Sequence, residues 1–236
     1  MKILALSTST PRGSAVVLEG DHVLGTGGYV DLQGHAERIF EAIDSALLAA
    51  GLARGDLAAI ACDPGPGSFT GVRVGVASAK GIALGLGDPL AGVISLEAMA
   101  AAAFAEGAAT ADDVVLAAID AKKDEVFLAA YALVDGAARA LAEPRCAPRT
   151  AAALTMPEET RRIVLVGEVV ASIEPLPPGL VRAPTLDLPD AAWVGRLAAR
   201  RLAAGEACDP ALLEPLYVRP PDARPLATPT RADPAT

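Results

Sequence analysis

One stretch of the sequence, residues 60–85, restricts the fold more than any other. A short apolar segment runs into a loop of alternating prolines and glycines, and the loop opens into a helix rich in small residues. Glycine permits close backbone approaches, whereas proline stiffens a loop and removes an amide donor. The pattern predicts a buried strand at 57–62 and a helix at about 70–85, with Ser68 or Thr70 as its N-cap.

The expected helix carries three interior glycines, Gly71, Gly75 and Gly81. Each costs about 1 kcal/mol relative to alanine, so close packing against the helix is the expected compensation. Packing on the chain's own sheet explains part of this pattern, but it needs only one side of the helix. Because valine and alanine occupy one side and small residues another, the second side is a candidate contact surface for a neighbouring helix.

The loop and the helix resemble the signature of the TsaB (YeaZ) family, a partner subunit in the bacterial synthesis of threonylcarbamoyladenosine in tRNA. The match runs over residues 64–73 and continues at Gly75 and 80–85. Further matches at 3–10, 118–126 and 214–219 follow in the family's order. The resemblance assigns the signature loop to Pro64, Gly65, Pro66, Gly67, Ser68, Phe69, Thr70 and Arg73.

The order of elements predicts a duplicated α/β fold. In the first half we expect strands at 2–7, 14–19, 22–30, 57–62 and 90–94, with helices at 36–50, 70–85 and from residue 96. In the second half we expect strands at 114–119, 126–133, 137–141 and 163–166, a short helix within 148–154 and a helix at 190–205. Two passes of strand-strand-strand-helix-strand-helix indicate duplicated domains. The resemblance implies the same: the actin/sugar-kinase/Hsp70-like (ASKHA, ribonuclease H-like) fold with βββαβα domains.

We divide the chain at the polar segment near residue 108. Residues 1–108 are expected to form the N-terminal ASKHA-like domain that carries the partner-binding helices, and 109–209 a smaller C-terminal one. Residues 210–236 are expected to be an extension that ends in a disordered, Pro-rich tail.

The composition indicates which kinds of molecule the chain can bind and where in the cell it is expected. The net charge is −9, and nucleic-acid affinity depends on clustered Lys and Arg, so contact with tRNA is expected to be indirect. Three widely separated cysteines without CxxC spacing indicate neither a disulfide framework nor a zinc ribbon. The first apolar run is too short for a signal peptide, and no segment is apolar enough to span a bilayer. A cytoplasmic protein with no membrane contact is expected.

The turn after the first strand is where kinases and ATPases of this fold carry an acidic residue beside metal and phosphates. The TsaB pattern also usually has Asp where this chain has Ser7. A hydroxyl cannot neutralise Mg²⁺ as a carboxylate does. The favoured interpretation of this turn is a polar strand end; a weak nucleotide contact through Ser7, Thr8 and Ser9 stays open.

No catalytic set assembles elsewhere in the sequence. The Pro/Gly loop lacks the Gly-Lys-Ser/Thr ending of a phosphate loop. Residues 120–125 fill the turn where TsaD has a glycine-rich loop, and we interpret their charges as turn and surface groups. His22 and His35 are 13 positions apart, so the metal-binding His pair of TsaD is absent. Cys62 has no basic neighbour and is expected to be inert. We therefore expect no catalytic residue, no metal and no cofactor of its own, with ATP/ADP and metal on partner subunits.

The resemblance implies a non-catalytic scaffold subunit that pairs with TsaD, through a four-helix interface, for threonylcarbamoyl transfer to the adenosine 3′ of the tRNA anticodon. The ATPase TsaE would cycle the assembly, and a homodimer would use a similar surface when TsaD is missing. The expected interface residues are His35, Ile39, Phe40, Ile43, Gly71, Val72, Val74, Gly75, Ser78 and Gly81. Two alternatives are kept: an active small-molecule kinase or ATPase of the same fold, and a glycopeptidase-like hydrolase.

Overall fold

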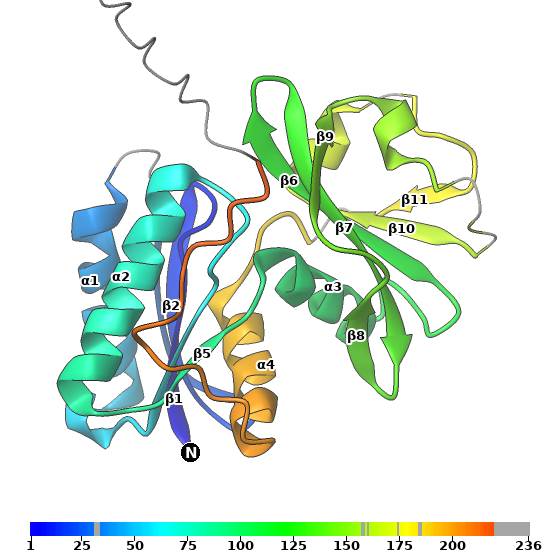
Figure 1. Cartoon of the computed structure of the whole chain (residues 1–236). Helices are drawn as coiled ribbons and strands as arrows, with labels where there is room; N and C mark the ends of the chain where they lie inside the picture. Colours follow the sequence, from blue (N-terminus) through cyan, green and yellow to red (C-terminus); the bar gives the residue numbers. More distant parts are fainter. Residues whose placement is uncertain (31–33, 157–158, 160, 174, 184–185, 220–236) are drawn as a thin grey trace, which may run out of the picture.

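Two mixed sheets, with helices between and outside them, form the protein in the computed structural model (Figure 1). The structure describes residues 1–30, 34–156, 159, 161–173, 175–183 and 186–219. The expected Pro-rich tail, 220–236, lies outside the described residues. Within the described part of the chain, no helix is both long and apolar enough to cross a membrane.

The first sheet has the strand order β3-β2-β1-β4-β5. Its strands are β1 (Lys2–Ser7), β2 (Arg12–Glu19), β3 (His22–Val30), β4 (Ala59–Cys62) and β5 (Leu90–Gly92). Strands β1 and β4 are parallel, with Leu6 opposite Cys62, so the residues that follow both strands meet at one edge of the sheet. Alternate side chains of β1 point to opposite faces. Leu4 and Leu6 face α1 (His35–Ala50) and α2 (Phe69–Leu86), and Ile3 and Ala5 face the interior between the sheets.

The second sheet has the order β11-β10-β6-β7-β8, and β9 also pairs with β7. Its strands are β6 (Val114–Lys122), β7 (Glu125–Val134), β8 (Ala137–Ala140), β9 (Arg145–Pro148), β10 (Ile163–Val166) and β11 (Leu180–Arg182). Two short 3-10 helices, η2 (Ala151–Leu154) and η3 (Glu168–Ser172), cover its outer face through Leu154 and Val169. A third, η1 (Arg54–Asp56), precedes β4.

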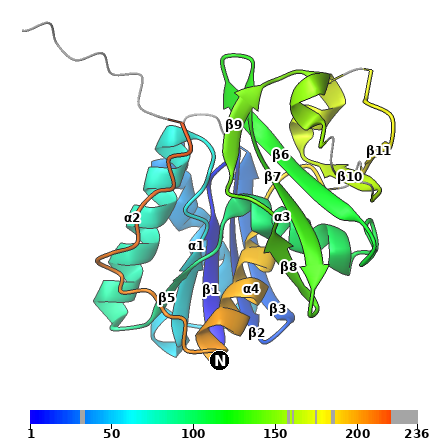
Figure 2. The ribbon, with the colours of Figure 1, turned by 45° about the vertical axis from the view of Figure 1, so that its right-hand side comes forward.

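Helices α3 (Ser95–Ala105) and α4 (Ala191–Ala203) lie between the two sheets (Figure 2). Helix α4 comes from the end of the chain, yet it packs on β1 and β2 of the first sheet. Gly195 permits this approach, because a Cβ there would collide with Leu18. Helix α3 comes from the first half and packs mainly on the second sheet. The division into 1–108 and 109–209 stays a prediction, and each of these two helices packs across it.

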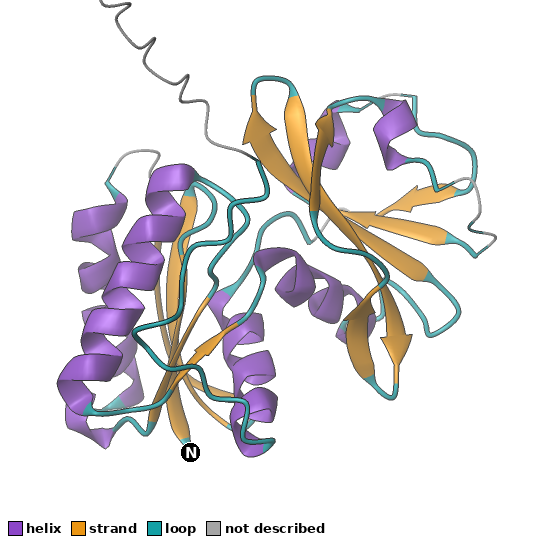
Figure 3. Ribbon diagram, in the orientation of Figure 1, coloured by secondary structure: helices purple, strands orange, loops and turns teal. Residues whose placement is uncertain are grey.

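Most predicted elements are present, as the arrangement of helices and strands in Figure 3 shows. The predicted βββαβα order of the first half is confirmed, with end shifts of one or two residues for most elements. The second half contains β9 and β11, which the sequence analysis did not anticipate, and a 3-10 helix rather than an α-helix within 148–154.

Candidate functional site

Four consecutive polar residues after β1, Ser7 to Thr10, are buried at the edge where β1 and β4 end. The hydroxyl of Ser7 donates a hydrogen bond to Asp63, and the Oγ of Ser9 donates one to Asp63 Oδ2 at 3.1 Å. Asp63 directly follows β4 and is only 1% exposed. A buried carboxyl group therefore organises the turn whose own sequence contains no acid.

Burial raises the pKa of Asp63 from 3.8 to about 6, although the hydrogen bonds from Ser7 and Ser9 act in the opposite direction. The sequence analysis missed this residue. A signal was available, because parallel pairing of the predicted strands places the residue after Cys62 beside the one after Leu6. Its neighbour Cys62 is fully buried, and burial raises the pKa of its thiol, in agreement with the expected inert cysteine.

The same turn fixes the start of α2. The amide of Ser68 donates to the carbonyl of Ser9 at 2.6 Å, and Thr8 Oγ1 donates to the carbonyl of Gly71 at 2.7 Å. A Cβ on Gly71 would collide with the carbonyl oxygen of Thr8, and one on Gly75 with Thr8 Oγ1. These two glycines are therefore required by packing inside the chain.

This packing corrects most of the expected partner interface. Seven of the ten residues are buried within the chain, and buried side chains offer no area to a partner: His35, Ile39, Ile43, Gly71, Val72, Gly75 and Ser78. His35 is the first residue of α1, and its Nδ1 lies 2.8 Å from the hydroxyl of Tyr29. Phe40 and Gly81 are exposed, and Val74 is half-buried. The physical reason is that α1 and the Ser7–Thr10 turn occupy the side of α2 that the sequence left unassigned.

A different part of α2 stays uncovered. Gly81 and Gly85 are exposed, and a Cβ on either would meet nothing within 4 Å, so no contact inside the chain requires a glycine there. We call these residues and their exposed neighbours on α2 the outer strip: Thr70, Ala77, Gly81, Leu84 and Gly85. Leu84 is 62% exposed, and on the adjacent α1 Phe40 is 45% and Leu48 83% exposed. Apolar side chains are thus exposed on both helices.

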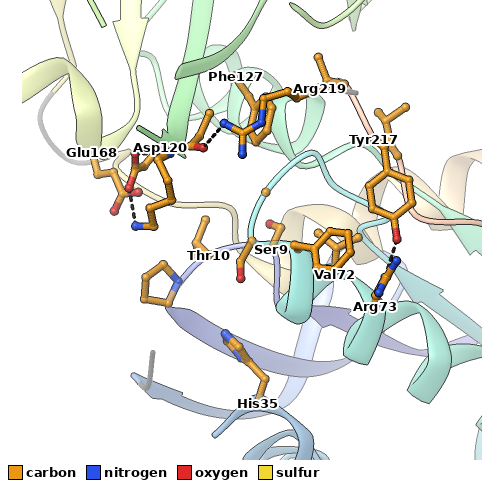
Figure 4. Close-up of a pocket in the computed structure, with 18 residues that line it drawn as sticks. Ser9, Thr10, His35, Val72, Arg73, Asp120, Phe127, Glu168, Tyr217 and Arg219 are labelled. Atoms are coloured by element: carbon orange, nitrogen blue, oxygen red, sulfur yellow. Dashed lines mark hydrogen bonds and ion pairs between the residues drawn. The ribbon is translucent and has the colours of Figure 1, made fainter. Parts of the chain in front are cut away.

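A cavity of about 620 Å³ lies between the edge of the first sheet and the β6–β7 hairpin (Figure 4). Its polar lining includes Ser9, Thr10 and His35 from one side and Asp120, Lys122 and Glu168 from the other. Phe69, Phe127 and Tyr217 add aromatic surface. Asp120 was interpreted as a turn and surface residue, and its place in the cavity wall corrects that interpretation.

The hairpin side of the cavity carries paired charges. Asp120 accepts hydrogen bonds from Lys122 and Arg149. Burial alone would raise the pKa of Asp120, but the hydrogen bonds from Lys122 and the two positive charges lower it overall. Burial and the charge of Asp120 raise the pKa of Glu168. The cavity wall therefore carries both signs of charge, because Arg73, Lys122 and Arg219 line it together with these two acids.

The residues present do not fit the nucleotide and metal that kinases of this fold hold. Ser7 and Thr8 are 1% and 0% exposed, and their hydroxyls are bound to Asp63 and to the Gly71 carbonyl. Of the three hydroxyls considered for nucleotide contact, Ser9 alone lines the cavity. Among the described residues, no group of three or more His, Cys, Asp and Glu side chains could hold a metal ion.

Comparisons with known proteins agree with this architecture. The family model of TsaD, described as tRNA N6-adenosine threonylcarbamoyltransferase, matches residues 30–180. YeaZ from Pseudomonas aeruginosa superposes with a TM-score of 0.78 at 30% identity, covering 92% of this chain and 99% of that one. Component A of the Acidaminococcus fermentans (R)-2-hydroxyglutaryl-CoA dehydratase gives 0.51 at 10% identity over 86% of this chain and 99% of that one, which supports the fold alone. The family-model match and the YeaZ superposition place the chain among proteins of the TsaD class.

Proteins similar in sequence identify the family within this class. An uncharacterized protein of Mycobacterium tuberculosis is 36% identical over 231 residues, 95% of each chain. The tRNA threonylcarbamoyladenosine biosynthesis protein TsaB of Escherichia coli is 40% identical over 131 residues, 56% of this chain and 55% of that protein. The chain belongs to the TsaB (YeaZ) family.

Proposed function

We propose that this chain is the non-catalytic subunit that pairs with TsaD in threonylcarbamoyl transfer to the adenosine 3′ of the anticodon in tRNA. Curated relatives of this family are named tRNA threonylcarbamoyladenosine biosynthesis proteins. The single observation that supports pairing is the outer strip, where α2 keeps exposed glycines that nothing inside the chain requires.

The proposed contact is between helices. A glycine destabilises a helix by about 1 kcal/mol relative to alanine. No close contact within this chain compensates for this cost at Gly81 or Gly85. Small side chains let a second helix approach closely, and Phe40, Leu48 and Leu84 add apolar area beside the strip. A four-helix interface with TsaD of about 1,200–2,000 Å² would cover this surface. A homodimer would use it when TsaD is absent.

The proposed subunit has no catalytic residue and no cofactor of its own. The hydroxyls of Ser7 and Thr8 are bonded to Asp63 and to the Gly71 carbonyl at the start of α2, so these two hydroxyls are committed to structure. ATP/ADP and metal are assigned to TsaD and TsaE. Because the net charge is −9, the tRNA is assigned to the partners as well.

Reconstitution tests this function. TsaD, TsaE and a threonylcarbamoyl donor are incubated with unmodified tRNA, with and without this chain, and the modified nucleoside is measured by mass spectrometry. We expect modification only when the chain is present. Equal yields without it would contradict the proposal.

A kinase or ATPase is the second candidate, because the cavity lies at the carboxyl ends of parallel strands, where α/β proteins bind ligands. The burial of Ser7 and Thr8 argues against it, since their hydroxyls are bonded within the chain and do not face the cavity. Phosphate release by the isolated chain, lost in Ser9→Ala but kept in the surface variant Ser45→Ala, would favour this candidate. We expect no release.

A further inference from the structure

The chain does not end at α4. Residues 209–219, which we call the clasp, return across the first sheet, run beside α2 and reach the β6–β7 hairpin of the second half (Figure 1). Just before the clasp, the amide of Cys208 donates to the carbonyl of Leu90 at 2.7 Å and covers the edge of β5.

The clasp is tied to the first half at several points. Lys80 Nζ on α2 donates to the carbonyls of Ala211 at 3.0 Å and Leu213 at 3.1 Å. The amide of Leu216 donates to the carbonyl of Pro64, in the signature loop, at 2.8 Å. Arg73 Nε then donates to the hydroxyl of Tyr217 at 2.7 Å, and the guanidinium group of Arg73 lies over the Phe69 ring at 3.7 Å from its centre.

The last residue of the clasp is tied to the other half. Arg219 Nη1 donates to Glu125 Oε2 on β7 at 2.7 Å and to the carbonyl of Ala121 on β6 at 3.1 Å. Residues 216–219 also line the cavity, with Tyr217 and Arg219 at its rim (Figure 4). One short segment therefore forms a cavity wall and links α2 to the opposite hairpin.

The attachment is weaker than that of the two sheets. All residues from 209 to 219 are described and none of them is buried; Leu212 is 75% and Tyr217 49% exposed. Both side chains of the Arg219–Glu125 pair are partly exposed, at 27% and 35%. Segments with few buried groups and exposed hydrogen bonds open locally without global unfolding.

We infer that the clasp is a conformational device that closes the cavity and holds the two halves together, and that its local release opens the cavity. The clasp is bonded to the first half and, at its last residue, to the second half. Loss of the bonds to one half therefore loosens the attachment of the clasp to the other half. This inference goes beyond the proposed function and does not depend on a partner.

Amide hydrogen exchange on the isolated full-length chain tests it. The reporter is the Leu216 amide, which bonds to the first half. Arg219→Ala removes the bonds to Glu125 and to the Ala121 carbonyl, and Glu125→Ala removes the ion pair but keeps the bond to the Ala121 carbonyl. We expect exchange at Leu216 to speed up about three- to tenfold, more in Arg219→Ala than in Glu125→Ala. The amide of Ser68, which bonds to Ser9 beside the cavity, should accelerate with it.

Three comparisons make the test decisive. Arg196→Ala removes a partly exposed arginine that donates to the carbonyl of Asp21 and leaves the clasp untouched, so exchange at Leu216 should stay as in the wild type. Core amides of β6 should also keep their rates in all variants, which separates local release from loss of global stability. The charge swap Arg219→Glu with Glu125→Arg should restore slow exchange. Unchanged exchange at Leu216 in both Glu125→Ala and Arg219→Ala would overturn the inference.

Discussion

At the scale of single residues, the glycines of α2 fall into two groups with opposite expected effects. Gly75 lies against Thr8, so Gly75→Ala should destabilise the fold by about 1–3 kcal/mol through overpacking. Gly81 faces open space, so Gly81→Ala should stabilise the isolated chain by about 1 kcal/mol through helix propensity. Urea unfolding of both variants and the wild type measures these changes in the free energy of unfolding. Shifts of the same sign at the two positions would contradict the packing described.

Asp63 should make stability depend on pH. The folded protein binds the Asp63 proton more tightly than the unfolded chain, so this group's contribution is complete below about pH 4 and is lost as pH rises through about 6. The rise in pKa from 3.8 to about 6 corresponds to about 3 kcal/mol. Asp63→Asn lacks this titration. Unfolding free energies of wild type and variant, measured from pH 4 to pH 8, should diverge by about that amount in favour of the variant; a constant difference would refute the assignment.

At the scale of elements, α4 depends on its N-cap. The Asp190 side chain accepts a hydrogen bond from the amide of Ala192 at 2.7 Å, and α4 joins the first sheet to the interior core. Asp190→Ala should lower the unfolding free energy by about 1 kcal/mol, whereas Asp190→Asn, which keeps a capping oxygen, should lose little. Thermal unfolding of the two variants measures their losses of stability. Equal losses in both variants would show that charge rather than capping stabilises this helix end.

Periodicity and turn residues predicted most of these elements. The apolar stripe of α1 and the strand-loop-helix pattern around residues 60–85 are local signals, and the structure confirms both. Two results depend on tertiary packing and were not predictable locally. One is which glycines of α2 face the Ser7–Thr10 turn and which face outward, and the other is the burial of Asp63. Strand β9 was missed because Arg145–Pro148 is short and shows no clean alternation.

At the scale of the whole molecule, two exchanges join the halves. Helix α3 of the first half packs on the second sheet, and α4 from the end of the chain packs on the first. Because the α3 and α4 layer fills the space between the sheets, the exposed faces of α1 and α2 point away from it (Figure 1). The cavity and the outer strip are therefore separate surfaces, and only the outer strip is assigned to partner binding.

The central claim, that the outer strip of α2 is the docking surface, is tested most directly by the affinity of this chain for TsaD. Isothermal titration calorimetry compares wild type with Gly81→Leu, which adds a side chain where the chain itself has room. Ala105→Leu makes a similar change at an exposed position near the end of α3 and serves as the control. We predict that Gly81→Leu weakens binding at least 100-fold with the fold unchanged by circular dichroism, while Ala105→Leu binds as wild type. Undiminished binding of Gly81→Leu to TsaD would contradict the account.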